Sequence, residues 1–172
     1  MTSKINYLNI LFALLFIAPL MGVSQIAKQD SLSLMEVVTD FQESIAKKDS
    51  IRFNQLFFTE SVSFVGIMSK DTEWSIKKNY AEFQGIAVSD HKSFINDICK
   101  SEKMSKEKFY DIELSTDGFI GSISFNYAFL SGDKMIQWGH EKWNLVREGE
   151  KWLITDVIYT IRFPKVEPFP YE

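Results

Sequence analysis

The sequence predicts a single α+β domain, with helices in the first part of the chain and a long antiparallel sheet in the second. Two observations carry this prediction. Upstream, apolar residues recur at steps of three and four, as on one face of an amphipathic helix. Downstream, residues 107–163 form an aromatic-rich series of strands separated by short turns. The turn signals are Asp117-Gly118, Ser131-Gly132-Asp133 and Glu148-Gly149. Since such a sheet has an apolar face to bury, the helices are expected to cover it.

Composition limits the functions that the chain can have. Its 172 residues, 45% hydrophobic and 15% aromatic, suit one domain with its own core. The net charge of −4 and the absence of a dense basic cluster argue against nucleic acid as a partner. Cys99 is the single cysteine, so no intramolecular disulfide can form, and His91 and His140 match no zinc-binding spacing. The sequence therefore predicts neither a metal nor a cofactor.

The first 24 residues have the pattern of a signal peptide. Lys4 gives a positive start, residues 10–20 are apolar, and Gly22-Val23-Ser24 offers small residues for cleavage. The apolar run is too short for a bilayer span, which takes roughly 20 residues. We expect a signal peptide at 1–24, one domain at 25–172, a periplasmic or secreted location, and no membrane anchor after cleavage.

The elements ahead of the meander are predicted in order. A helix begins at Ser31 or Ser33 and continues to residue 45, and a short second helix follows at 50–58. Residues 61–68 are β-branched and aromatic, which predicts a strand. Residues 72–88 keep no clean period and are interpreted as an irregular or hairpin-like connection. Ser89 or Asp90 then caps a third helix through Cys99, and the charged residues 100–108 are interpreted as a solvated linker.

Turn lengths predict which strand residues face one another. A two-residue Glu148-Gly149 turn sets Glu141 opposite Asp156, and a two-residue Asp117-Gly118 turn sets Tyr110 opposite Phe125. Of two lengths for the middle turn, a three-residue loop keeps one face apolar over all four strands. The apolar face then contains Phe119, Ile123, Phe125, Tyr127, Phe129, Met135, Gly139, Trp143, Leu145, Trp152, Ile154 and Ile158. The outer face contains Asp111, Glu113, Ser122, Ser124, Asn126, Lys142 and Asn144 with Trp138, His140 and Tyr159.

Glu141 and Asp156 are the candidate acid–base residues. Opposite each other in a low-dielectric interior, two carboxylates resist ionising together, so one keeps its proton near neutral pH. Tyr127 could donate a hydrogen bond to a developing oxyanion. In the structural alternative, Glu141 lies at the rim in an ion pair and Asp156 faces water from a bulge. His140 is expected to lie outside, at an interface.

The element order and the closing strands resemble the nuclear transport factor 2-like superfamily. The resemblance covers residues 31–163. The segment 138–146, followed by 149–155, is similar to the G-x-W-x-I ending of SnoaL-like members, and the strand Trp-Gly-x-Glu-x-Trp is similar to exported, uncharacterised bacterial proteins. The resemblance implies a cone-shaped α+β fold, with three helices packed on a strongly curved antiparallel sheet around a central pocket. It also implies a homodimer formed through the outer face of the sheet.

Members of this superfamily include isomerases, cyclases, dehydratases and non-catalytic binders. SnoaL-like chains often have histidines where this chain has Asp156 and Ile158, so this chain lacks the residues for a histidine-based mechanism. Two functions stay open. One is an exported, non-catalytic domain that binds a small apolar molecule or a partner. The other is a cofactor-independent isomerase, cyclase or dehydratase that uses Glu141 and Asp156. The predicted pocket residues are Phe125, Tyr127, Trp143, Trp152, Ile154 and Ile158, and the predicted interface residues are Trp138, His140 and Tyr159.

Overall fold

The computed structural model describes residues 18–171. Its helices in this range are α2 (Ala18–Lys47), α3 (Ser50–Asn54), α4 (Lys70–Lys77) and α5 (His91–Lys100). Its strands are β1 (Ser63–Met68), β2 (Ile86–Asp90), β3 (Ser105–Thr116), β4 (Ile120–Ser131), β5 (Lys134–Glu148) and β6 (Lys151–Ile161). Most of the predicted signal peptide lies outside the described residues, and residues 18–24 belong to α2. Within residues 18–171, no helix is both long and apolar enough to cross a membrane.

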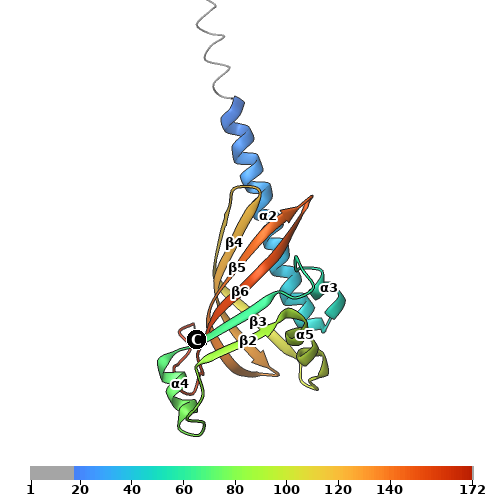
Figure 1. Cartoon of the computed structure of the whole chain (residues 1–172). Coiled ribbons are helices and arrows are strands. Elements are labelled where there is room, and N and C mark those ends of the chain that lie inside the picture. Colours follow the sequence, from blue (N-terminus) through green and yellow to red (C-terminus); the bar gives the residue numbers. More distant parts are fainter. Residues whose placement is uncertain (1–17, 172) are drawn as a thin grey trace, which may run out of the picture.

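The six strands form one mixed sheet in the order β2-β1-β6-β5-β4-β3. The meander β3 to β6 is antiparallel, as predicted, and β1 and β2 are also antiparallel to each other. However, β1 lies parallel to β6, so the prediction of a wholly antiparallel sheet is wrong. The parallel pair arises because the chain leaves β1, forms α4, β2 and α5, and then passes through β3, β4 and β5 before β6 returns beside β1 (Figure 1).

Each predicted helix is present, and one more appears. Asp90 caps α5 by accepting a hydrogen bond from the backbone N–H of Ser93, and Asp49 caps α3 in the same way. The additional helix α4 begins at Lys70 and continues into residues 72–88, where an irregular connection was expected. It was missed because it buries only Thr72 and leaves Trp74 64% exposed, so it carries no apolar stripe for a pattern to reveal.

The core lies between one face of the sheet and helices α2, α3 and α5. Phe41 of α2 stands at its centre, with its ring centroid 4.9 Å from that of Phe53 and 4.5 Å from that of Trp143. Phe94 of α5 packs on Phe53 and on Phe64 of β1. Aromatic rings therefore fill the space between the layers, and they hold the three helices on the inner face of the sheet.

Three β-bulges correct the predicted strand register. Shifts occur between Tyr110 and Glu113, between Phe129 and Leu130, and between Asn144 and Leu145. A bulge adds one residue to one strand, so side chains beyond it exchange faces. Phe109 replaces Tyr110 on the inner face. The middle turn contains two residues and not the three that were predicted, which by itself would exchange the faces of β5 relative to β4. The bulge beside the turn reverses this exchange, so Phe125 and Tyr127 lie on the predicted inner face.

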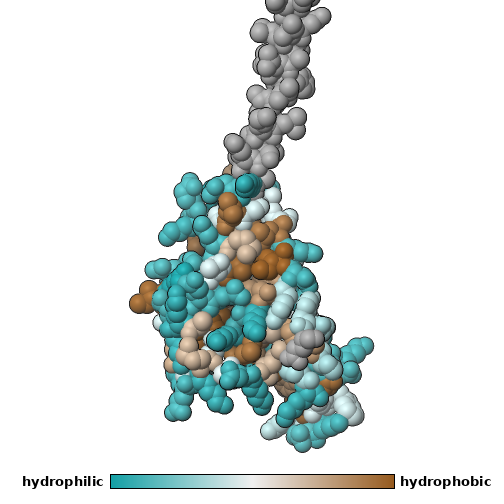
Figure 2. Space-filling model, turned by 180° about the vertical axis from the view of Figure 1, so that it is seen from behind, coloured by the Kyte–Doolittle hydropathy of each residue, from teal (hydrophilic) through white to brown (hydrophobic). Residues whose placement is uncertain are grey.

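The C-terminal segment, residues 163–171, crosses the outer face of the sheet. Glu167 accepts hydrogen bonds from Ser69 and Thr72, which holds the segment beside α4 (Figure 1). Phe169 and Tyr171 then pack on Tyr110 of β3. Seen from behind, the surface is largely hydrophilic, with apolar residues gathered in a central band (Figure 2).

Candidate functional site

The structure separates the two carboxylates that were predicted to form an acid–base pair. Glu141 is 5% exposed and faces the interior, opposite Tyr159 of β6. Asp156 lies on the outer face, where its carboxylate accepts hydrogen bonds of 2.7 and 2.9 Å from the side-chain amide of Asn144. The prediction that Glu141 and Asp156 are paired is therefore wrong. Glu148 pairs with Lys151, so the turn is formed by Gly149 and Glu150 and not by Glu148 and Gly149, and the bulge between Asn144 and Leu145 then shifts the register by one further residue.

The carboxyl group that interacts electrostatically with Glu141 is that of Glu107, on β3. Glu107 was expected in a solvated linker, but β3 begins at Ser105 and turns this residue inward, opposite Phe129 of β4. Glu107 is 9% exposed, and no described residue donates a hydrogen bond to its buried Oε2 atom. Burial, and then the negative charge of Glu141, raise the pKa of Glu107 well above that of an ordinary carboxyl group.

Glu141 belongs to the same buried polar cluster. The indole Nε1 of Trp143 donates a hydrogen bond of 2.5 Å to Oε1 of Glu141. Burial raises the pKa of Glu141 to about 7, although this hydrogen bond lowers it in part. A carboxyl group with such a pKa holds its proton in a large fraction of molecules at neutral pH. Burial and mutual repulsion therefore disfavour simultaneous ionisation of Glu107 and Glu141, which is the behaviour that was expected of Glu141 and Asp156.

Two tyrosines complete this cluster. Tyr127, 1% exposed, donates a hydrogen bond of 2.9 Å to the backbone oxygen of Thr160, and the ring of Tyr159 meets it edge-on. Burial raises the pKa of Tyr127 well above its ordinary value, and burial raises that of Tyr159 to about 12. Both phenols therefore stay protonated as hydrogen-bond donors. Tyr159 was predicted at an outer interface; this is wrong, because its register partner is the inward-facing Glu141.

The other predicted pocket residues do not surround a central pocket. Phe125, Trp143 and Ile154 are 0% exposed and pack as core. Trp152 is 3% exposed and donates a hydrogen bond to Ser33 of α2. Ile158 is 49% exposed on the outer face, opposite Lys142, so its assignment to the interior is wrong for the same reason as that of Asp156.

The outer face divides into a covered part and a bare part. Trp138 does face outward, but the C-terminal segment covers it: its Nε1 donates to the backbone oxygen of Glu167, and Phe169 packs on its ring. His140 is exposed, as predicted, and borders an outer groove of about 330 Å³ with Ile67 and Ile158. Dimerisation through this face stays a prediction.

A largely apolar hollow on the helix side of the sheet lies between α5 and the ends of β3 and β4. It has a volume of about 470 Å³, and we call it the α5 cleft. Its apolar lining comes from Phe94, Ile98, Phe129 and Ile136. Its polar lining consists of Ser89, Ser93, Asp97, Ser101, Ser105 and Ser131. Phe129, at the cleft wall, is the strand neighbour of Glu107, so the cleft adjoins this buried carboxyl group.

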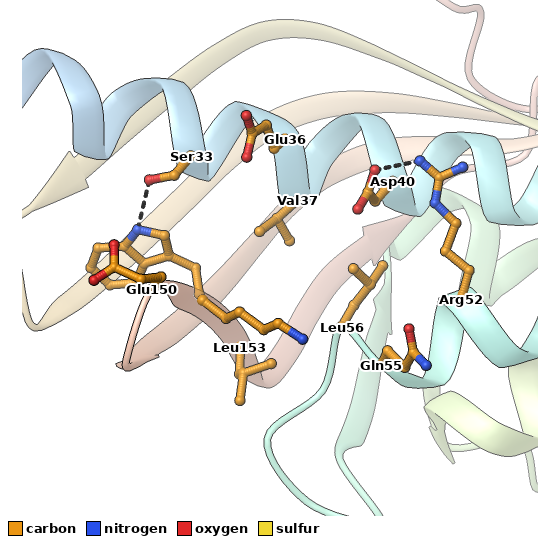
Figure 3. Close-up of a pocket in the computed structure, with 11 residues that line it drawn as sticks. Ser33, Glu36, Val37, Asp40, Arg52, Gln55, Leu56, Glu150 and Leu153 are labelled. Atoms are coloured by element: carbon orange, nitrogen blue, oxygen red, sulfur yellow. Dashed lines mark hydrogen bonds and ion pairs between the residues drawn. The ribbon is translucent and has the colours of Figure 1, made fainter.

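A second hollow, between α2, α3 and the turn from β5 to β6, is smaller. Its volume is about 180 Å³, and Figure 3 shows Ser33 and Asp40 of α2 across from Gln55 and Leu153. Asp40 forms an ion pair with Arg52, and Ser33 accepts the hydrogen bond from Trp152. Since these polar groups already have partners, this hollow is the weaker candidate. Among the described residues, no three His, Cys, Asp or Glu side chains are close enough to hold a metal ion.

Similarity to known proteins is found in structure and not in sequence. No protein-family model matches the chain, and no curated protein matches it. A candidate dehydratase of the nuclear transport factor 2-like family from Streptomyces avermitilis matches with a TM-score of 0.59 and 13% identity, covering 80% of this chain and 99% of its own.

Two structures from Novosphingobium aromaticivorans match as well. A nuclear transport factor 2-like protein with a cystatin-like fold has a TM-score of 0.60 and 8% identity, covering 82% of this chain and 87% of its own. A candidate scytalone dehydratase has a TM-score of 0.60 and 9% identity, covering 81% and 89%. The chain thus has the α+β fold of nuclear transport factor 2-like proteins, with its helices packed on a six-stranded mixed sheet.

Proposed function

We propose that this protein is an exported, non-catalytic domain that binds a small, largely apolar molecule in the α5 cleft. The observation that carries the proposal is the contrast between a filled core and an open cleft. Phe125, Trp143 and Ile154 leave no exposed surface inside, whereas Ile136 at the cleft remains 40% exposed. The volume of about 470 Å³ lies in the range of small-molecule sites, roughly 300 to 1,000 Å³.

The lining of the cleft indicates the kind of ligand. Phe94, Ile98, Phe129 and Ile136 offer apolar contact, and burying apolar surface there contributes about 25 cal/mol per Å². Hydroxyl groups around the cleft can orient one or two polar atoms of the ligand. A molecule with an apolar body and a polar end fits this arrangement.

The test is the binding of octanol to the full chain by isothermal titration calorimetry. The variant Ile136→Trp fills the cleft, and we expect it to weaken binding by about tenfold or more. Ile120→Trp is the matched control, because Ile120 is an exposed isoleucine of β4 outside the cleft. If octanol does not bind, or if both variants bind it equally well, the proposal is wrong.

A second candidate function is a cofactor-independent isomerase or dehydratase. The buried pair Glu107 and Glu141, with Tyr127 beside it, favours this candidate, and two of the structural neighbours are named as candidate dehydratases. One carboxylate could accept a proton from carbon while a phenol donates to the substrate oxygen. The second candidate predicts that the protein accelerates exchange of the α-hydrogens of cyclohexanone with D₂O, followed by NMR, and that Glu141→Gln does not. If the α-hydrogens of cyclohexanone exchange no faster with the protein than in buffer alone, the enzymatic candidate is wrong and the binding function is the one that stands.

A further inference from the structure

The two buried carboxylates lack a positive partner. No basic side chain within the described residues forms an ion pair with Glu107 or Glu141, and no described donor reaches Oε2 of Glu107. The single side-chain hydrogen bond to the pair comes from Trp143. Burying ionised carboxylates without a partner is costly, so the site requires either a proton or a cation.

Aromatic faces and phenols surround this pair. Besides burial, the negative charges of both carboxylates raise the pKa values of Tyr127 on β4 and Tyr159 on β6. The ring of Phe109 packs on Phe125, which is the strand neighbour of Glu141. Aromatic rings attract cations through their negative faces. Two carboxylates among aromatic rings form a setting that favours an organic cation over an anion or a neutral polar group.

Charged groups on the neighbouring elements do not oppose the preference of this site for a cation. Arg162, at the end of β6, influences Tyr127 and pairs with Glu167 of the C-terminal segment. From α2, the side-chain amide of Gln42 binds the backbone oxygen of Glu107 and brings no charge. From α5, Asp97 lines the α5 cleft and adds a further negative charge.

Glu107 is the member of the pair that adjoins the α5 cleft. Ser105 lines the cleft, and Glu107 is two residues further along the same face of β3, about 7 Å away along the strand. Phe129 stands opposite Glu107 and also lines the cleft. The register partner of Glu107 and its neighbour on the same face of β3 therefore both line the cleft, which places Glu107 next to the cleft wall.

We propose that Glu107 and Glu141 form the charged end of the α5 cleft and bind the ammonium group of an apolar amine. The proposal rests on the proposed binding function and names the class of ligand. The ammonium donates to the free Oε2 of Glu107, the aromatic rings face the cation, and the apolar body of the amine fills the cleft. Without an amine, the pair keeps a proton instead, as the raised pKa values of both carboxyl groups indicate.

The experiment compares octylamine with octanol, which share an apolar chain and differ in charge. Both are titrated into the full chain at about pH 6 and about pH 8, where octylamine stays protonated as a lysine side chain does. We expect octylamine to bind about tenfold more tightly than octanol at the higher pH, because charge-assisted hydrogen bonds are the stronger ones. The advantage should shrink at the lower pH, since the ammonium group then competes with protonation of the carboxyl groups.

Two variants identify the groups responsible. Glu107→Gln keeps the shape of the side chain and should remove the advantage of octylamine while octanol still binds. Asp97→Asn, which changes a carboxylate at the cleft, should keep most of that advantage. Circular dichroism verifies that each variant is folded, and Glu141→Gln repeats the test if Glu107→Gln is not.

The outcomes separate this proposal from the binding function. If octanol and octylamine bind equally at both pH values, the amine proposal is wrong and the binding function stands. If Asp97→Asn removes the advantage and Glu107→Gln does not, the cation lies at the surface and the proposal is equally wrong. If neither probe binds, the binding function fails, and the amine proposal fails with it.

Discussion

The inner and outer faces of the sheet hold carboxylates in opposite ways. Inside, Glu141 accepts one side-chain hydrogen bond, from Trp143, no described residue donates to Oε2 of Glu107, and burial raises the pKa of each carboxyl group. Outside, Asp156 accepts two hydrogen bonds from Asn144, and Asp111 accepts them from Asn126 and Tyr171. The outer carboxylates are supplied with donors and water, whereas the inner pair is not. The supply of hydrogen-bond partners, and not sequence position, therefore distinguishes the two kinds of acid.

The largest expected difference between the two faces is in stability. Phe125 is 0% exposed, with its ring centroid 3.9 Å from that of Phe109, while its neighbour Ser124 points to the outer face. Phe125→Ala should lower the free energy of unfolding by roughly 3 to 5 kcal/mol, and Ser124→Ala by less than about 0.5 kcal/mol. Urea denaturation measures both. Equal losses would show that the two residues do not face opposite sides.

A smaller, pH-dependent difference is expected between Glu141 and Asp156. The folded pKa of Glu141 is about 7, above the ordinary 4.5, so the native state keeps a proton that the unfolded chain has lost. Its contribution to the free energy of unfolding is therefore full below about pH 4.5 and is lost as the pH rises through about 7. Glu141→Gln, which cannot ionise, should be more stable than the wild type at about pH 8, by roughly 1 to 3 kcal/mol.

The control for this prediction is Asp156→Asn. It removes a carboxylate from the outer face, where water and Asn144 solvate it, so no gain in stability is expected at high pH. Thermal melts across the range from about pH 5 to about pH 8 measure both variants. A gain in Asp156→Asn as large as that in Glu141→Gln would indicate a general effect of net charge and not burial of one acid.

The smallest effect is expected at the end of the chain. The hydroxyl of Tyr171 bonds to Asp111 and receives a hydrogen bond of 2.6 Å from Asn126, all at exposed positions. Tyr171→Phe removes these bonds and keeps the ring stacked on Tyr110, so we expect a loss of about 0.5 to 1.5 kcal/mol. Hydrogen exchange at the amides of residues 163–171 should accelerate. Unchanged exchange would mean that the rings alone hold the segment.

The sequence was sufficient for the elements and insufficient for the site. Periodicity revealed α2, α3 and α5, and glycine turns revealed the meander, because burial of an apolar face repeats over many residues. A bulge adds a single residue, and no sequence signal near Asn144 predicts it. One such residue moved Asp156 and Ile158 outside and Tyr159 inside. Glu107 was missed because a charged run conceals one inward-facing acid; its alternation with Ser105 and Phe109 was the available signal.

The bulge at Asp111 has a consequence for the far end of the chain. Asp111 adopts a φ of 51°, in the left-handed region that few side chains favour, and Tyr171 and Asn126 hold its carboxylate there. The hydrogen bonds of Tyr171 therefore connect the final residues of the chain to β3, the strand that also carries Glu107 and Phe109 on its inner face. A protease that removes these final residues would act on that strand from the outer face, without touching an inner residue.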